Sequence, residues 1–230
     1  MNEINFDNQQ PQPVMDLQVT RNDEKISVAF PGYSAEQVSV IKKTVAKGTT
    51  DTELALFIYT ATSAGLNPLL KEIWCYKMRD RLLIFAGRDG FLKKAQQNPK
   101  YAGMRSSSVR EKDIFEINIP AGTVNHIITN ESNKKRGPIT GAYAFVYRRD
   151  EEPTLVWSDF ETYTKDGANF DNAWKTHPDD MIIKCAEIRA LKKAFGMAEL
   201  ENPYDWQTTK DGRVSPIDHQ LLPNFRNNQK

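Results

Sequence analysis

The chain has 230 residues, of which 39% are hydrophobic, a length and composition that suit one domain of moderate size with tails. It carries 31 Lys and Arg against 30 Asp and Glu, so no overall positive field attracts a polyanion, and any nucleic-acid surface must be local. A charged fraction of 27% and the lack of a long apolar run exclude a membrane-spanning protein.

The N-terminal segment is polar. Residues 1 to about 30 are rich in Gln, Asn and Pro, with too few apolar positions to build a compact structure. We therefore predict a flexible N-terminal arm over residues 1–33. The segment also lacks the basic-then-apolar order of a secretory signal, so we expect a cytoplasmic protein.

The core is predicted to begin with two helices. Ser34 and Gln37 fit a capping box, and the apolar residues after them recur at helical spacing toward Gly48. A second helix is expected from Asp51 through Ser63. The spacing of its apolar residues predicts an inward face made of Leu54, Phe57, Ile58 and Ala61.

A run of strands follows these helices. Residues 72–87 alternate in polarity and predict a β-hairpin with its turn at Arg79-Asp80, followed by a short helix over GFLKKAQQN that Asp89 can cap. Further strands are expected at residues 103–110, 114–120, 123–129 and 139–147, with 153–157 as another candidate and 130–137 as a surface loop. Helices segregated from a run of antiparallel strands predict an α+β fold.

The last predicted helix lies in HPDDMIIKCAEIRALKKAFG, residues 177–196. Its apolar residues recur at spacings of three and four, which places them on one buried face. At about 100° per residue, Lys192, Arg189 and Lys193 form one contiguous basic arc beside that face, and Lys184 lies towards its other edge. Such an arc can be a solvated helix flank or one side of a nucleic-acid site, and the helix alone leaves both readings open.

Two less regular regions flank this helix. Residues 159–175 contain turn residues and no clear periodicity, so we expect irregular structure there. Past Tyr204 the chain turns polar again, and residues 205–230 are predicted to be a tail without fixed order. The predicted core therefore spans residues 34–204.

The sequence shows no motif of a known type of enzyme. It contains no phosphate-binding glycine loop, no dinucleotide fingerprint and no nucleophile elbow, and its histidines share no metal-ligand spacing with Cys75 and Cys185, which we expect to be reduced core residues. We therefore predict no cofactor and no catalytic residue. The alternative is a Mg²⁺-dependent nuclease that uses the acids of one loop region, although these can equally be charged turn residues: Asp159, Glu161, Asp166 and Asp171.

Several short blocks occur in an order and spacing that resemble one family. They are GLNP at residues 65–68, KEIW at 71–74, GRDGF at 87–91, YAGM at 101–104, and Trp174 with the His177-Pro178 pair and the helix that follows. On these blocks the chain resembles the RecT/Redβ family of phage single-strand annealing proteins, over about Asp51 to Tyr204. Each block alone is weak, but the set together is specific.

The resemblance implies a function. Members of that family bind single-stranded DNA and anneal it to a complementary strand without ATP, as homo-oligomers that form rings or helical filaments. It therefore implies a recombination protein of a phage in its bacterial host cell, with single-stranded DNA and annealed duplex as ligands and no membrane. A phage 5′→3′ exonuclease and the host single-strand-binding protein are implied as partners. A purely structural protein that assembles but ignores DNA is the third hypothesis.

The resemblance also implies DNA-binding positions. Four residues match basic family positions: Lys71, Arg148, Arg149 and Lys192. Two more, Arg79 and Lys165, lie near other basic positions of the family. The neighbours of Lys192 on the last helix are Lys184, Arg189 and Lys193. Trp174 can stack on a base or can anchor the core or a subunit interface. The chain departs from the family at Asp179 and Asp180, where basic residues are expected.

Overall fold

The structure is a computed structural model, and it describes residues 19–22, 25–28, 32–78, 81–128, 132–164, 172–197, 200–202, 204, 206–208 and 214–216. Its first two helices are those predicted: α1 spans Ala35–Thr44 and α2 spans Asp51–Ser63. Each begins with a capping box, at Ser34 with Gln37 and at Thr50 with Glu53, so side chains satisfy N–H groups of the first turn. The inward face of α2 is buried as expected.

The predicted hairpin follows a short 3₁₀ turn, η1 (Pro68–Leu70). Strands β3 (Ile73–Met78) and β4 (Arg81–Ala86) pair antiparallel, which confirms the hairpin; its predicted turn lies outside the described residues. The next helix, α3, spans Arg88–Gln96 and begins two residues earlier than predicted. Asp89 lies in its first turn rather than at the cap, because Gly87 already has the extended backbone of an N-cap residue.

The largest sheet has the strand order β5-β8-β9, all antiparallel: β5 (Tyr101–Arg110), β8 (Ile139–Arg148) and β9 (Glu151–Asp159). A hairpin of β6 (Ile114–Asn118) and β7 (Thr123–Ile127) lies between β5 and β8 in the chain. These strands confirm the predicted run and the α+β class. Alternation along β8 buries Ala142, Ala144 and Val146, while the aromatic residues between them face the other side.

The β6–β7 hairpin packs on that aromatic side of the sheet. The ring of Phe115 stacks on Trp157 at 5.2 Å and on Tyr143 at 5.8 Å between ring centroids. Trp157 in turn lies against Gly141, where an added Cβ would be 2.3 Å from an indole carbon. Only glycine permits this contact, so the residue at position 141 sets how closely the indole approaches the sheet.

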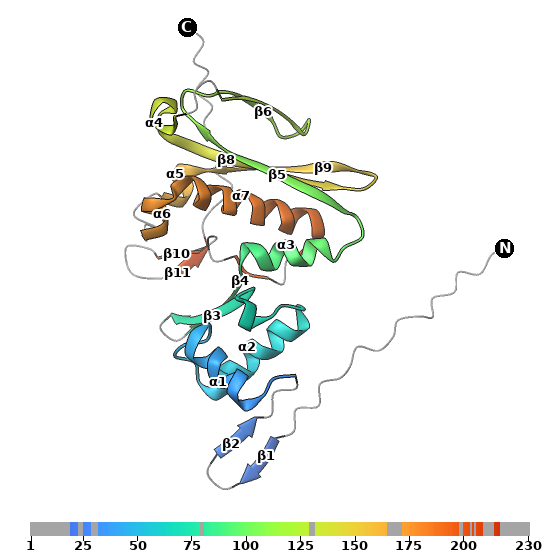
Figure 1. Cartoon of the computed structure of the whole chain (residues 1–230), viewed down its shortest axis with the longest axis vertical. Coiled ribbons are helices and arrows are strands. Elements are labelled where there is room, and N and C mark those ends of the chain that lie inside the picture. Colours follow the sequence, from blue (N-terminus) through green and yellow to red (C-terminus); the bar gives the residue numbers. More distant parts are fainter. Residues whose placement is uncertain are drawn as a thin grey trace, which may run out of the picture.

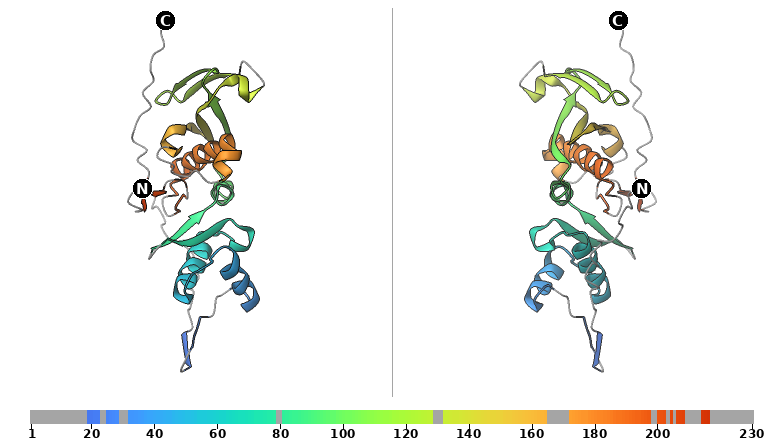
Figure 2. Two further views of the ribbon diagram at one scale, coloured as in Figure 1. Left: turned by 90° about the vertical axis from the view of Figure 1, so that its left-hand side faces the viewer. Right: turned by 90° about the vertical axis from the view of Figure 1, so that its right-hand side faces the viewer.

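Helix α7, Pro178–Phe195, crosses the opposite face of the sheet and ends at Gly196, which has a positive φ of 64°. Figure 1 shows α7 beneath the sheet with α3 alongside it, and α1, α2 and the β3–β4 hairpin at one end of the molecule. The layers are also visible in the two turned views of Figure 2. Cys75 and Cys185 are buried thiols in this core, as predicted.

Several segments predicted to be irregular contain short elements. Helix α4 (Asn133–Arg136) replaces the predicted surface loop, and α5 (Phe160–Thr164) and α6 (Asn172–Thr176) lie in the stretch before α7. The predicted arm contains the hairpin β1 (Val19–Asn22) and β2 (Lys25–Val28), and the predicted tail contains β10 (Trp206–Thr208) and β11 (Val214–Pro216). Elements of three to five residues carry too little periodicity to be recognised in a sequence. The limits of the arm, core and tail stay predictions.

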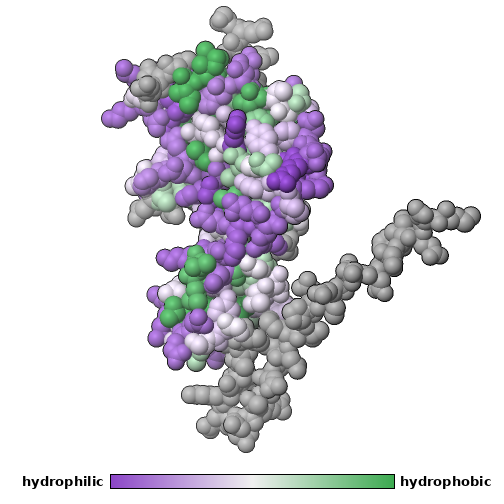
Figure 3. All heavy atoms as spheres, turned by 45° about the vertical axis from the view of Figure 1, so that its right-hand side comes forward, coloured by the Kyte–Doolittle hydropathy of each residue, from purple (hydrophilic) through white to green (hydrophobic). Residues whose placement is uncertain are grey.

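The surface is largely hydrophilic in the view of Figure 3, with apolar patches toward both ends of the molecule. Exposed large apolar side chains occur on α1, α2 and η1 at one end and on or beside the β6–β7 hairpin at the other: Val40, Leu56, Tyr59, Leu70, Ile114, Ile119, Ile127 and Ile128. Among the described helices, none combines the length and the apolar character needed to cross a membrane.

A buried carboxylate fixes α7 against its neighbours. Glu187 is only 6% exposed, and it accepts hydrogen bonds from Arg88 Nε of α3 at 2.8 Å and from Ser106 Oγ of β5 at 2.6 Å. Burying a carboxylate is unfavourable unless such donors surround it. The position of α7 is therefore specified by charge pairing as well as by apolar packing.

We predict that Glu187→Ala destabilises the protein by about 2–3 kcal/mol, because it leaves Nε of Arg88 and the hydroxyl of Ser106 without their acceptor, while Nη1 of Arg88 keeps its bond to Asp89. The free energy of unfolding measured in urea checks this. Glu161→Ala removes an exposed carboxylate of α5 and is the matched control, expected to change stability by less than about 0.5 kcal/mol. Equal stability of the two variants would contradict the role of Glu187.

Candidate nucleic-acid interface

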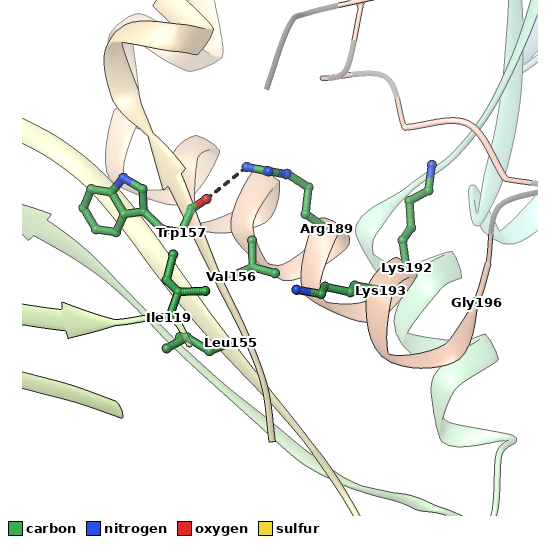
Figure 4. A pocket seen from close by; sticks show the side chains of 8 residues that line it. All are labelled: Ile119, Leu155, Val156, Trp157, Arg189, Lys192, Lys193 and Gly196. Carbon is green, nitrogen blue, oxygen red and sulfur yellow. Dashed lines mark hydrogen bonds between the residues drawn. The ribbon is translucent and has the colours of Figure 1, made fainter. Parts of the chain in front are cut away.

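A groove of about 460 Å³ lies between α7 and the edge strand β9 (Figure 4). Its apolar side is formed by β9 and by Ile119, just beyond β6, and its basic side is formed by the C-terminal half of α7. The lining residues are Ile119, Leu155, Val156, Trp157, Arg189, Lys192, Lys193 and Gly196. We call this the α7–β9 groove. It brings together the three residues of the basic arc that the helical spacing predicted.

The three cations of the groove are held differently. Arg189 Nη1 donates to the carbonyl oxygen of Trp157 at 3.0 Å and to Ser158 Oγ at 3.2 Å, so it is tied to the edge of the sheet. Lys193 extends toward Val156, whereas Lys192 points away from the apolar side chains of β9 (Figure 4). The Nζ atom of Lys192 lies 5.9 Å from the centroid of the Phe91 ring.

The charge of the groove is one-sided. Its lining contains three cations and no carboxylate, although the whole chain has a net charge of only +1. Cations gathered along one wall create a local positive potential that attracts a polyanion even when the protein is nearly neutral. The apolar wall opposite them offers van der Waals contact without hydrogen-bond selection.

Arg148 and Arg149 lie at the turn between β8 and β9. This turn is close to the C-terminal end of α7, because Tyr101, which pairs with Arg148, packs against Phe195 at 6.1 Å. Arg148 forms an ion pair with Glu151, so part of its charge is already neutralised. A hydrogen bond from Lys100, aided by the charges of Arg148 and Lys100, lowers the pKa of Glu151 against the opposing effect of burial. Arg149 is exposed.

Lys71 and Lys184 line a different cavity of about 450 Å³, between the β3–β4 hairpin, the start of α3 and α7. We call it the hairpin–α7 cavity. Its lining is Lys71, Trp74, Gly87, Arg88, Asp89, Asp180, Ile183, Lys184, Glu187 and Tyr204. The structure therefore places Lys71 and Lys184 apart from the three cations of the α7–β9 groove.

Three of the blocks that carried the family resemblance, GLNP, KEIW and GRDGF, form the joint beside this cavity. Glu72 accepts hydrogen bonds through its carboxylate from Asn67 N at 2.8 Å and from Lys93 Nζ at 2.7 Å, and through its carbonyl oxygen from Gly87 N at 3.0 Å. At Gly90 an added Cβ would lie 2.4 Å from that same carbonyl oxygen. These residues hold the hairpin against α3.

Trp174, a predicted DNA-binding position, is buried in the core. Trp174 is 2% exposed, stacks on Tyr163 with ring centroids 6.0 Å apart, and meets Tyr204 edge-on. Its rings are covered in this structure, so the packing favours the core alternative over base stacking. Arg79 and Lys165 lie outside the described residues.

The acidic departure at the start of α7 has a structural explanation. Asp179 accepts hydrogen bonds from Arg110 and from Ser108 Oγ of β5, so it fastens the N-terminal turn of α7 to the sheet. Its carboxylate also lies near the positive end of the helix dipole. Asp180 is exposed and lines the hairpin–α7 cavity.

The acids of the nuclease alternative are not seen to converge. Asp159 accepts hydrogen bonds from the N–H and hydroxyl of Thr162, at 3.1 and 3.3 Å, and thereby caps α5. Glu161 is exposed, and Asp166 and Asp171 lie outside the described residues. In the part of the chain that is described, no three or more His, Cys, Asp or Glu side chains are grouped as metal ligands.

A buried ionic cluster near the groove was missed by the sequence analysis. The Asp113 carboxylate accepts two hydrogen bonds from Arg136, at 2.8 and 2.7 Å, and lies 3.1 Å from Nε2 of His126. His126 Nδ1 lies 3.3 Å from the hydroxyl of Tyr143. The cluster ties the β6–β7 hairpin and α4 to the sheet, and Ile119 of the groove follows β6. The cluster joins the turn between β5 and β6 to β7, α4 and β8, and residues so far apart in the chain leave no local pattern in the sequence.

The electrostatics of this cluster favour the ionised carboxylate. Burial by itself raises the pKa of Asp113, but hydrogen bonds from Arg136, from the Arg110 N–H and from His126, together with the charge of Arg136, outweigh it and hold that pKa well below its usual range. The same pair also favours the charged form of Arg136, because the hydrogen bond to Asp113 raises the pKa of Arg136.

Comparison with known proteins gives two findings. The sequence pattern that defines the RecT family matches residues 31–212, which include both cavities. A protein named "Recombination protein bet", from Escherichia phage lambda, is 26% identical over 172 residues, covering 71% of this chain and 55% of that protein. The chain thus spans about half the length of this curated relative.

We predict that Asp113→Asn flattens the acid dependence of stability. A carboxylate whose pKa is lowered on folding stabilises the native state above its unfolded pKa of about 4, and that contribution is lost as pH falls toward the folded pKa. The variant should be less stable at pH 7 and should lose less stability between pH 4 and pH 2. Urea unfolding midpoints at pH 7 and between pH 4 and pH 2 measure both effects. Parallel pH profiles of the two proteins would contradict the prediction.

Proposed function

This chain belongs to the RecT family, and from that membership we propose that it binds single-stranded DNA and anneals it to a complementary strand without ATP, in phage recombination. The lambda relative, whose name describes a recombination protein, supports the same proposal. The observation that carries it is the α7–β9 groove, where three cations and no carboxylate face an apolar wall.

The groove suits a single strand held by its backbone. Lys192, Lys193 and Arg189 can neutralise phosphates, and contact of this kind reads no base sequence. The apolar wall of β9 can contact sugars or base faces without distinguishing one base from another. Annealing requires a protein that holds the strand without reading its sequence, because base pairing between the strands then supplies all of the specificity.

The proposed DNA surface extends beyond the groove. Arg148 and Arg149 lie at the same end of α7 and would continue the phosphate path, with Arg149 the more available of the two because Glu151 pairs with Arg148. Arg79 and Lys165 stay proposed contacts on the family resemblance, whereas Trp174 is left out because its rings are buried.

Tight binding by this nearly neutral chain would come from assembly. A homo-oligomer, as a ring or a helical filament, multiplies weak contacts along one strand. Exposed apolar side chains at both ends of the molecule support contacts between neighbouring copies, because a head-to-tail contact of two different patches repeats along a chain of subunits. A phage exonuclease and the host single-strand-binding protein are the partners that we propose, in the cytoplasm of a bacterial host.

The activity is tested with a fluorophore and a quencher on two complementary oligonucleotides, mixed with the protein in EDTA and without nucleotide. We predict annealing that is faster than the protein-free control, with both strands intact, because the groove needs neither metal nor ATP to hold phosphates. Annealing at the control rate would refute the proposal. Loss of labelled oligonucleotide after Mg²⁺ is added would instead favour the nuclease alternative.

The groove itself is tested by the double variant Lys192→Ala/Lys193→Ala. It should weaken binding of a labelled single strand and reduce the slope of log affinity against log salt by about 0.7 for each phosphate that the protein no longer neutralises. Fluorescence anisotropy from low to moderate salt measures both quantities, and thermal unfolding checks the fold. The control is Lys43→Ala, at an exposed lysine on α1. Affinity and slope equal to those of the control would remove the groove from the DNA path.

A further inference from the structure

The hairpin–α7 cavity differs from the groove in its charge. Its lining contains the cations Lys71, Arg88 and Lys184 and the carboxylates Asp89, Asp180 and Glu187, three against three. Two of these carboxylates are already engaged by Arg88, at 2.9 Å from Asp89 and 2.8 Å from Glu187. A cavity with balanced charge has no preference for a polyanion backbone, so a different part of a nucleic acid has to be considered.

One wall of this cavity is aromatic. Trp74 of β3 lines it and is half-buried, with part of its indole packed on Gly87, where an added Cβ would lie 2.7 Å from a ring carbon. Gly87 therefore allows the indole to lie against the start of α3. The joint formed by Glu72 fixes the strand that carries Trp74, so the ring is held by its surroundings before any ligand arrives.

The cavity and the groove lie on opposite sides of α7. Lys184 of the cavity and Lys193 of the groove are nine residues apart, which turns their side chains by about half a circle around the helix axis. Their Cα atoms are also about 13 Å apart along the axis. The two cavities are thus separate sites, each with its own chemistry.

We propose that the hairpin–α7 cavity is a subsite for one unpaired nucleobase, which stacks on Trp74 while charged side chains of both signs meet its edge. A nucleobase presents donors and acceptors together, and it matches a lining that contains both. Every base has a π-face, so stacking on Trp74 is compatible with binding any sequence. The inference rests on the proposed function, since it assumes a DNA strand bound to the same molecule.

This subsite distinguishes single strands from duplex. A base that occupies the cavity is turned away from its neighbours and cannot pair, and turning a base out of a duplex is much less favourable than turning it out of a single strand. Trp74 therefore stabilises the complex with an unpaired strand and contributes nothing once that base is paired. Annealing withdraws the base from the cavity, and the groove on the other side of α7 continues to hold phosphates.

The test compares two oligonucleotides of equal length, one normal and one with abasic sites throughout, by fluorescence anisotropy. Trp74→Leu should weaken binding of the normal strand by about tenfold, the effect typical of removing one base–aromatic stack, and should leave binding of the abasic strand unchanged. Trp74→Phe keeps a ring and should stay close to the wild type on both. Tyr76→Leu, at an exposed aromatic residue of β3 that lines neither cavity, is the matched control.

Each other outcome overturns the subsite. If Trp74→Leu binds the normal strand as tightly as the wild type does, no base stacks there, although the groove and the proposed function stand. If Trp74→Leu weakens both strands equally and Trp74→Phe does the same, Trp74 supports the fold rather than a base. If the wild-type chain binds neither strand, the proposed function fails and the subsite fails with it.

Discussion

The burial of α7 is the constraint on which the rest of the structure depends. This helix packs on the sheet and on α3, with the carboxylate of Glu187 buried inside that packing and the partly buried carboxylate of Asp179 at its first turn. Asp179 meets Arg110 and Ser108 of β5, and Glu187 meets Arg88 of α3 and Ser106 of β5. A buried carboxylate without such donors is strongly unfavourable, so these pairs fix the rotation of α7 about its own axis.

That rotation decides what each basic residue of α7 faces. Arg189, Lys192 and Lys193 meet the edge of the sheet and form a one-sided positive groove, whereas Lys184 meets the β3–β4 hairpin in a cavity of balanced charge. The first environment suits phosphates and the second suits a base. The net charge of +1 gives no sign of this arrangement, because acidic residues elsewhere in the chain offset the positive charges of the groove.

Several residues of the blocks that mark the family hold the fold and are not among those proposed to bind DNA. Asn67, Glu72, Gly87 and Gly90 hold the hairpin against α3 through hydrogen bonds and close backbone contacts that a side chain would prevent. They thereby position Lys71, a proposed DNA-binding residue, and Trp74, the proposed stacking residue, at the cavity.

The sequence by itself determined the capped helices α1 and α2, the β3–β4 hairpin, the strands of the main sheet and the basic arc of α7, since these depend on periodicity and on neighbours along the chain. Only the tertiary structure decided which side chains oppose one another. Trp174 and Trp74 are both isolated aromatic residues in the sequence, yet one is covered by Tyr163 and the other lines a cavity. The cluster of Asp113, Arg136 and His126 joins the turn between β5 and β6 to α4 and β7, and such long-range contacts leave no local pattern in the sequence.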